Sequence, residues 1–155
     1  MNTLEILNRM KKLPFGLKAF SRIICLKAPY FSSIKPEFTR LEPGIGEAKM
    51  EKRRAVTNHI GTVHAIAMAN LCEFVGGMTL EVSVPKTHRW IPASMKIDYL
   101  KKAKTDVYAS TNIKVESWPD SGPVTVHVDV FDQKKVKVVQ ADIEMYVSLK
   151  SKNPK

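Results

Sequence analysis

The sequence has few cysteines and no long apolar run near its start. Its 155 residues include two cysteines, Cys25 and Cys72. They stand in apolar surroundings at no metal-binding spacing, and two thiols are too few for the disulfide framework of a small secreted domain. Basic residues interrupt every apolar stretch between Met1 and Phe31, so we expect neither a signal peptide nor a membrane span there. We therefore expect a protein of the reducing cytoplasm.

Acidic residues are also scarce. The chain has 25 Lys and Arg against 15 Asp and Glu, a net charge of +10. No acid lies between Ile6 and Pro36, a segment that contains the basic residues Arg9, Lys11, Lys12, Lys18, Arg22, Lys27 and Lys35. This charge favours nucleic acid, anionic lipid or phosphorylated cofactors as partners. The sequence has no RNP signature, GXXG loop or zinc-finger spacing, so no nucleic-acid partner is expected.

The N-terminal segment has the apolar spacing of two short amphipathic helices. Apolar residues recur from Leu4 to Met10 and again from Leu17 to Ile24, and Pro14 and Gly16 interrupt the pattern. We interpret residues 1–34 as a helical segment that caps the core and is dispensable for the chemistry. Peripheral membrane contact through a basic surface helix is the alternative interpretation.

The rest of the chain predicts one apolar helix and several strands. Two short extended segments lie between Glu37 and Arg54, and the helix runs from about His64 to Leu80. Strands with one buried face follow, over residues 95–99, 107–115, 124–130 and 136–149. The last strand changes phase near Val138 and Val139, which predicts a β-bulge. The order indicates an α+β domain over residues 35–150 with a tail at 151–155, in which a single sheet buries the helix by curling around it.

The helix and its approach carry a family resemblance. In "NHIGTVHAIAMANLCE" the residues Asn58, Gly61, His64 and Glu73, followed by the strand "RWIPASMKIDYLKKA", resemble the hotdog-fold thioesterase superfamily. The similar branch contains the phenylacetate-pathway type and an uncharacterised tetrameric acyl-CoA thioesterase-like group. The resemblance implies a hotdog fold, a curved antiparallel β-sheet wrapped around a central α-helix, here with extra N-terminal helices. It also implies hydrolysis of an acyl-CoA thioester.

The sequence departs from the family pattern at two places. The His-Gly-Gly of the family is His64-Ala65-Ile66 here, and the acid is Glu73 where this branch often has Asp. Family members polarise the thioester carbonyl with the backbone N–H that follows the His, and an alanine retains that N–H. Ile66 is expected to narrow the space through which the substrate approaches.

The resemblance assigns a role to each residue of the motif. It implies a homodimer or homotetramer with the site at the subunit interface, where Asn58 and Ala65 of one chain face Glu73 of the other. Glu73 would act as base or nucleophile, the Ala65 N–H would hold the oxyanion, and Asn58 would orient the reactants. We interpret His64 as fixing the loop and the helix start, with general-base chemistry as the alternative.

The residues themselves leave alternatives open for these roles. No basic residue lies three or four positions from Glu73, and an unpaired buried carboxylate is costly, so Glu73 is either kept for chemistry or paired across an interface. Asn58 can equally bond its own turn. We expect His59 and His88 at the surface, Cys72 in the core, and no metal site.

Basic residues after the helix are candidates for binding coenzyme A, which is part of the substrate and the only cofactor expected. Arg89, Lys101, Lys102 and Lys104 could neutralise its phosphates at the rim of a pocket. The alternative function is a non-catalytic hotdog module that binds acyl-CoA or an acyl chain, a reading that Ile66 favours.

Overall fold

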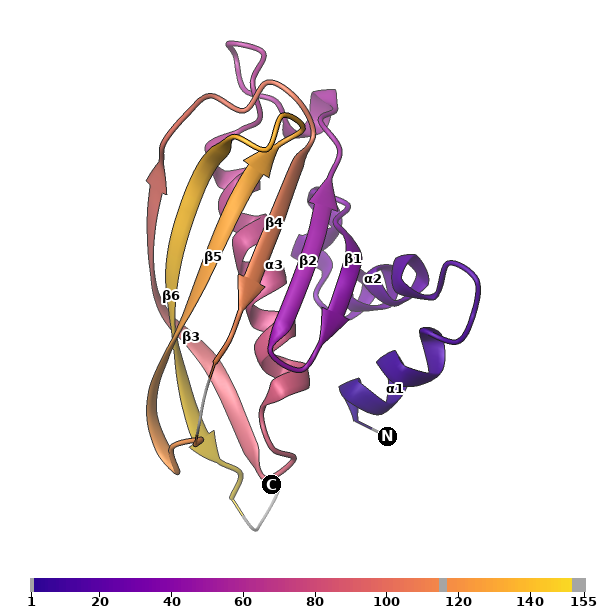
Figure 1. Cartoon of the computed structure of the whole chain (residues 1–155), viewed down its shortest axis with the longest axis vertical. Helices are drawn as coiled ribbons and strands as arrows, with labels where there is room; N and C mark the ends of the chain where they lie inside the picture. Colours follow the sequence, from indigo (N-terminus) through magenta and orange to yellow (C-terminus); the bar gives the residue numbers. More distant parts are fainter. Residues whose placement is uncertain (1, 115–116, 152–155) are drawn as a thin grey trace.

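One long helix lies against a six-stranded antiparallel sheet that curves around it (Figure 1). The computed structural model describes residues 2–114 and 117–151. The strand order is β1-β2-β4-β5-β6-β3, and α3 (Ala65–Ser83) is the central helix. The predicted hotdog architecture is confirmed.

The element bounds agree with most of the sequence expectations. The strands are β1 (Glu37–Glu42), β2 (Ile45–Met50), β3 (His88–Tyr99), β4 (Val107–Asn112), β5 (Ser121–Asp132) and β6 (Lys137–Leu149). The helices before the sheet are α1 (Thr3–Met10), α2 (Gly16–Lys27) and the short 3₁₀ turn η1 (Pro29–Ser33); a second 3₁₀ turn, η2 (Arg54–Val56), follows β2. Strand β3 begins at His88 rather than near Met95. The sequence did not predict this earlier start because the first half of the strand is largely exposed and lacks the apolar alternation. The predicted strand over 107–115 ends earlier, at Asn112: Ile113 and Lys114 are not in a strand, and Val115 lies outside the described residues.

Helix α3 is the centre of the core. Leu71, Cys72, Phe74 and Val75 are fully buried. The helix is long and apolar enough to span a membrane, but 67% of that window is buried inside the fold, as in the core helix of a globular domain. A Cβ at Gly77 would lie 2.9 Å from the Trp90 ring, so this glycine lets β3 approach the helix closely.

The predicted β-bulge is confirmed on β6. Val130 pairs with Val139 and Phe131 pairs with Lys137, so Val138 is the extra residue. Both Val138 and Val139 are buried, which is the phase change visible in the sequence. A second irregularity, between Pro92 and Ser94 on the edge strand β3, had no sequence signal beyond the proline itself.

The N-terminal helices close one edge of the sheet. Helix α2 lies beside β1 (Figure 1), and the buried Ser21 hydroxyl accepts the Phe38 N–H at 2.9 Å while donating to the Leu17 carbonyl. Leu7 and Phe20 are buried in the same core as the sheet residues. Residues 2–34 therefore extend the core, and the division at residue 34 stays a prediction.

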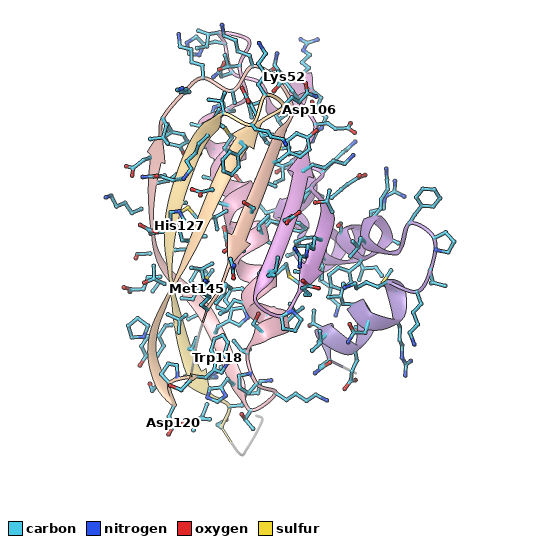
Figure 2. The ribbon with its side chains drawn as sticks, in the orientation of Figure 1. Lys52, Asp106, Trp118, Asp120, His127 and Met145 are labelled. Carbon is cyan, nitrogen blue, oxygen red and sulfur yellow. The ribbon has the colours of Figure 1, made fainter. Side chains whose placement is uncertain are left out.

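A charged cluster lies on the outward face of the sheet around His127 (Figure 2). Its Nδ1 is 2.7 Å from an Asp142 oxygen and its Nε2 is 3.0 Å from an Asp129 oxygen, and Lys137 also pairs with Asp129 at 2.8 Å. The hydrogen bond to Asp142, with a further bond to Asp129, raises the pKa of His127 above its ordinary value of 6.5.

This raised pKa predicts a pH-dependent contribution to stability. A group with a raised folded-state pKa stabilises fully below its unfolded pKa, and the contribution is lost as the pH rises through the folded pKa. His127→Gln should therefore lower the stability at about pH 6 by about 0.2–1 kcal/mol, because the ring is half exposed, and by less at pH 9. Thermal melts at both pH values, with the exposed His59→Gln as control, measure this difference. An equal loss at both pH values would contradict it.

Candidate functional site

His64 fixes the start of α3. It is the N-cap residue, and its Nδ1 accepts the Ile66 N–H at 3.1 Å while its backbone N–H donates to the Val56 carbonyl at 2.8 Å. An accepting Nδ1 requires the neutral tautomer with its proton on Nε2. These contacts are those of the positioning role that the resemblance implies.

The Ala65 N–H is unused within the described residues. Ala65 is the first residue of α3, so its N–H has no acceptor within the helix, and no other described group accepts it. The positive end of the helix dipole lies at the same point. The Ala65 carbonyl, in contrast, accepts the Tyr99 hydroxyl at 3.2 Å, which ties the helix start to the end of β3. The helix start therefore presents a free donor at Ala65.

Asn58 bonds to its own loop. Its Oδ1 accepts the N–H groups of Ile60 and Thr62, and its Nδ2 donates to the Thr62 hydroxyl at 2.8 Å. Gly61, at φ +76°, completes the turn. The amide thus shapes the loop that leads into α3, and one Nδ2 hydrogen remains for another partner.

The side chain of Glu73 is half-buried on α3, and its carboxylate forms no hydrogen bond or ion pair with any described residue. Helical spacing puts it on one face with Ile66, Ala69 and Gly77. The side chain of Ile66 on this face is 56% exposed. This face is covered by Trp90 of β3 at Gly77 and becomes more accessible toward Ile66, and the half-buried carboxylate between them has no partner in the described chain.

Ala65 and Glu73 cannot act on one carbonyl group within a single chain. They are eight residues apart on a straight helix, which is about 12 Å along its axis. The structure therefore brings Asn58, His64 and Ala65 together at the helix start and leaves Glu73 apart from them.

The four basic candidates also lie apart within one chain. Arg89 lies at the beginning of β3, where its Nε donates to the Ser148 hydroxyl at 3.3 Å. Lys101, Lys102 and Lys104 follow the end of this strand and are exposed. The strand between Arg89 and Tyr99 is about 33 Å long, so a single chain does not form one rim from these residues.

Sequence reasoning missed a second carboxylate that joins three elements. Glu81 of α3 accepts the Thr3 hydroxyl of α1 and the Trp90 indole N–H of β3, each at 2.8 Å. Its position two turns after Glu73 on an apolar helix was the available signal. Glu81 is satisfied by these bonds, so Glu73 remains the unpaired carboxylate of the pair.

Two buried polar atoms were also missed. The Oδ1 of Asn70 and the Nε2 of His88 are buried without a partner among the described residues. The expectation that His88 lies at the surface is wrong: it is 8% exposed, because it pairs with Leu149 of β6 at the first position of β3 and its Nδ1 lies 2.9 Å from the Thr87 hydroxyl. Asn70 lines a pocket of about 170 Å³ with His64 and Ile66, next to the helix start.

An apolar cavity lies between the N-terminal helices and α3. It has a volume of about 270 Å³ and is lined by Thr3, Ile6, Phe20, Ile23, Ile24, Lys27, Ala28, Phe31, Met78, Glu81 and Trp90. Trp90 forms part of its wall and rests on Gly77, one helical turn from Glu73. On α3 the cavity is lined by Met78 and Glu81, which follow the unpaired carboxylate in sequence.

Neither a reactive Cys72 thiol nor a cluster of metal ligands is found among the described residues. Burial raises the pKa of Cys72 to about 12, so the thiol stays protonated and unreactive at neutral pH. No group of three or more His, Cys, Asp or Glu side chains in residues 2–114 and 117–151 could hold a metal ion.

Comparisons with known proteins identify the family and agree with the fold. The profile of a family described as "Domain of unknown function (DUF4442)" matches residues 16–147. A search of curated proteins finds no match. The solved structural-genomics protein APC5556 is 40% identical, with a TM-score of 0.84 over 96% of this chain and 99% of that one.

Two other solved structures show the same fold at lower identity. A Pseudomonas aeruginosa protein of unknown function, described as a probable thioesterase, is 19% identical with a TM-score of 0.78 over 89% of this chain and 97% of its own. Zebra fish thioesterase superfamily member 2 is also 19% identical, with a TM-score of 0.72 over 84% of this chain and 95% of its own.

Proposed function

The chain belongs to the DUF4442 family and has the hotdog fold of the thioesterase superfamily, and from this premise we propose that it hydrolyses acyl-CoA thioesters at a site shared by two copies. The observation that carries the proposal is the pair of unused groups on α3: a free N–H at Ala65 and an unpaired carboxylate at Glu73. Both cysteines are free thiols, which fits a cytoplasmic enzyme.

The open edge of the sheet supports a two-chain site. Helix α2 covers β1, whereas β3 is the other edge strand and is largely exposed. The unpaired N–H and C=O groups of an edge strand can form hydrogen bonds with a strand of another chain. When two copies are related by a two-fold axis, their β3 strands run antiparallel. The half-buried side chains of Met95 and Ile97 then meet the second copy. Two α3 helices also run antiparallel, so Ala65 of one chain approaches Glu73 of the other.

The chemistry follows from these two groups. As a base, Glu73 accepts a proton from water as the water oxygen attacks the carbonyl carbon. As a nucleophile, Glu73 attacks that carbon itself and the thiolate leaves; water then hydrolyses the acyl–Glu73 anhydride, which regenerates the carboxylate and supplies the proton to the thiolate. The charge that develops on the carbonyl oxygen is held by the partner's Ala65 N–H at the helix start. The carbon–sulfur bond then breaks, and the proton passes to the departing thiolate. Asn58 and His64 hold the loop and the N–H in position.

The same pairing unites the basic residues. When two β3 strands pair antiparallel about their middle, Arg89 of one chain comes next to the partner's Lys101, Lys102 and Lys104. Four exposed cations then lie at each end of the shared strand pair, where they can neutralise the phosphates of coenzyme A.

The acyl tail is proposed to enter the cavity between α2 and α3. Each methylene buried there should raise kcat/KM about fourfold until the cavity is full. Ile23→Trp adds bulk at the half-buried lining and should move the preferred acyl-CoA to shorter chains, as measured by thiol release across chain lengths. Leu26→Trp, at an 82% exposed position of the same helix, is the control and should leave the profile unchanged.

Two results of this assay would contradict different parts of the proposal. An unchanged chain-length profile in Ile23→Trp would show that the cavity does not hold the acyl tail, and would leave the proposed thioesterase activity standing. A purified wild-type protein that releases thiol from no acyl-CoA leaves the non-catalytic acyl-CoA-binding module, which Ile66 in place of a glycine favours.

A further inference from the structure

The outward face of α2 combines exposed apolar residues with basic ones. Phe15, Lys18, Ala19, Arg22 and Leu26 recur at helical spacing and are all exposed. Phe15 is 83% exposed and Leu26 is 82% exposed, and Leu13 in the preceding loop is 61% exposed. We call these six residues the α2 face. The opposite side of α2, with Phe20, Ser21 and Ile24, is buried in the core.

The two ends of the α2 face carry its large apolar side chains. Phe15 and Leu26 are eleven residues apart, about 16 Å along the helix. Isolated exposed apolar residues are ordinary, but three large ones on one helix and its adjoining loop form a line that no described part of this chain covers.

Phe15 has an uncommon backbone conformation at the start of α2. It has φ 57° and ψ 21°, the left-handed region that non-glycine residues rarely adopt, at the N-cap of α2. Gly16 follows it in close contact with the Met10 carbonyl, which fixes the sharp turn between α1 and α2. In Figure 1 this turn projects from the molecule on the side away from β3. The backbone therefore places an aromatic ring at a protruding loop.

The charged residues of the α2 face itself, Lys18 and Arg22, are both basic. The residues from Ile6 to Pro36 contain no acid, and Arg9, Lys12, Arg22 and Lys27 form no ion pair with any described residue. Lys18 is the exception, because it pairs with Glu37 at 2.7 Å. A partner for this face must accept apolar side chains and several cations together, which an anionic lipid surface does.

We propose that the α2 face docks this protein on anionic membranes. Helix α2 lies parallel to the surface, with Leu13, Phe15 and Leu26 inserted between lipid headgroups and Arg22 on their phosphates. The face lies at the β1 side of the sheet, so docking leaves the β3 edge free for a second copy. The proposal does not depend on the thioesterase assignment.

Vesicle co-sedimentation tests the proposal. The full chain should bind vesicles of phosphatidylcholine with 30% phosphatidylglycerol and not vesicles of phosphatidylcholine alone, and raised salt should weaken the binding. Phe15→Ser should lower the affinity at least tenfold, and Arg22→Gln about fivefold, the effect of one cation near an anionic surface. Leu149→Ser, at a 45% exposed apolar position on β6, is the matched control and should bind as wild type.

Three outcomes would overturn the proposal. One is failure of the wild-type protein to sediment with anionic vesicles. A second is binding that Leu149→Ser weakens as much as Phe15→Ser does. The third is concentration-dependent self-association without vesicles that Phe15→Ser abolishes, which would assign the α2 face to a second copy of the chain. Thermal melts of each variant establish that it is folded.

Discussion

Replacing Ala65 with proline should lower kcat about 10²- to 10³-fold while leaving the fold intact, because the substitution removes only the proposed oxyanion donor. Proline suits the first position of a helix, where its missing N–H has no intrahelical acceptor. The preceding residue, His64, has φ −66° and ψ 138°, the extended conformation that proline requires before it. Thiol release from an acyl-CoA measures the loss.

The control for this variant is Ala65→Gly, which keeps the N–H and should retain most of the activity. Equal melting temperatures for Ala65→Pro and wild type would show that the helix start has survived. A folded Ala65→Pro protein with wild-type kcat would remove the Ala65 N–H from the mechanism and leave the binding of substrate at the helix start to other groups.

Replacing Glu73 with glutamine should lower turnover by about 10²-fold or more, because the amide cannot take a proton from water or attack the carbonyl carbon. Affinity for acyl-CoA should change little, since Glu73 is proposed to act at the thioester rather than on the nucleotide. Glu144→Gln, at an exposed position of β6, is the matched control. Since Glu73 has no partner among the described residues, the variant should melt near wild type. Unchanged activity in the folded variant would end the catalytic assignment.

Mixing the two inactive variants tests whether the site is shared. Co-expressed Ala65→Pro and Glu73→Gln chains pair at random, so half of the dimers are mixed, and each mixed dimer keeps one intact site of two. Activity should therefore recover to about a quarter of wild type. A site contained in one chain would give no recovery. Light scattering should show a mass at least twice the 17.5 kDa of the chain.

The sequence predicted the sheet and the central helix because both depend on local periodicity. The alternation of β5 and β6, and even the extra residue at Val138, can be seen in the order of apolar residues. The start of β3 could not, because an edge strand with Ile91, Pro92 and Ala93 exposed has no buried face to impose a pattern.

The sequence predicts the local structure around the candidate residues but not how distant residues are placed relative to one another. The Asn58 loop and the His64 cap follow from local spacing, and the structure has both. In the Thr3–Glu81–Trp90 contact, Thr3 and Glu81 are 78 positions apart in sequence, so no local pattern could predict it. The distance between Ala65 and Glu73 follows from helical geometry alone. The proposal that two chains share the site also required the strand order, which shows that β3 is the open edge of the sheet.

The strand order also bears on how the chain folds. Strand β3 follows α3 directly but pairs with β6, and β2 pairs with β4 across the whole length of the helix, so neither pairing can form as a hairpin. Non-local pairings of this kind must close long loops first, which makes folding slow. Because β3 has no neighbour until β6 has been synthesised and docked, the edge proposed to pair two copies exists only in a folded monomer. If two chains pair through this edge, only chains that have completed their folding can assemble.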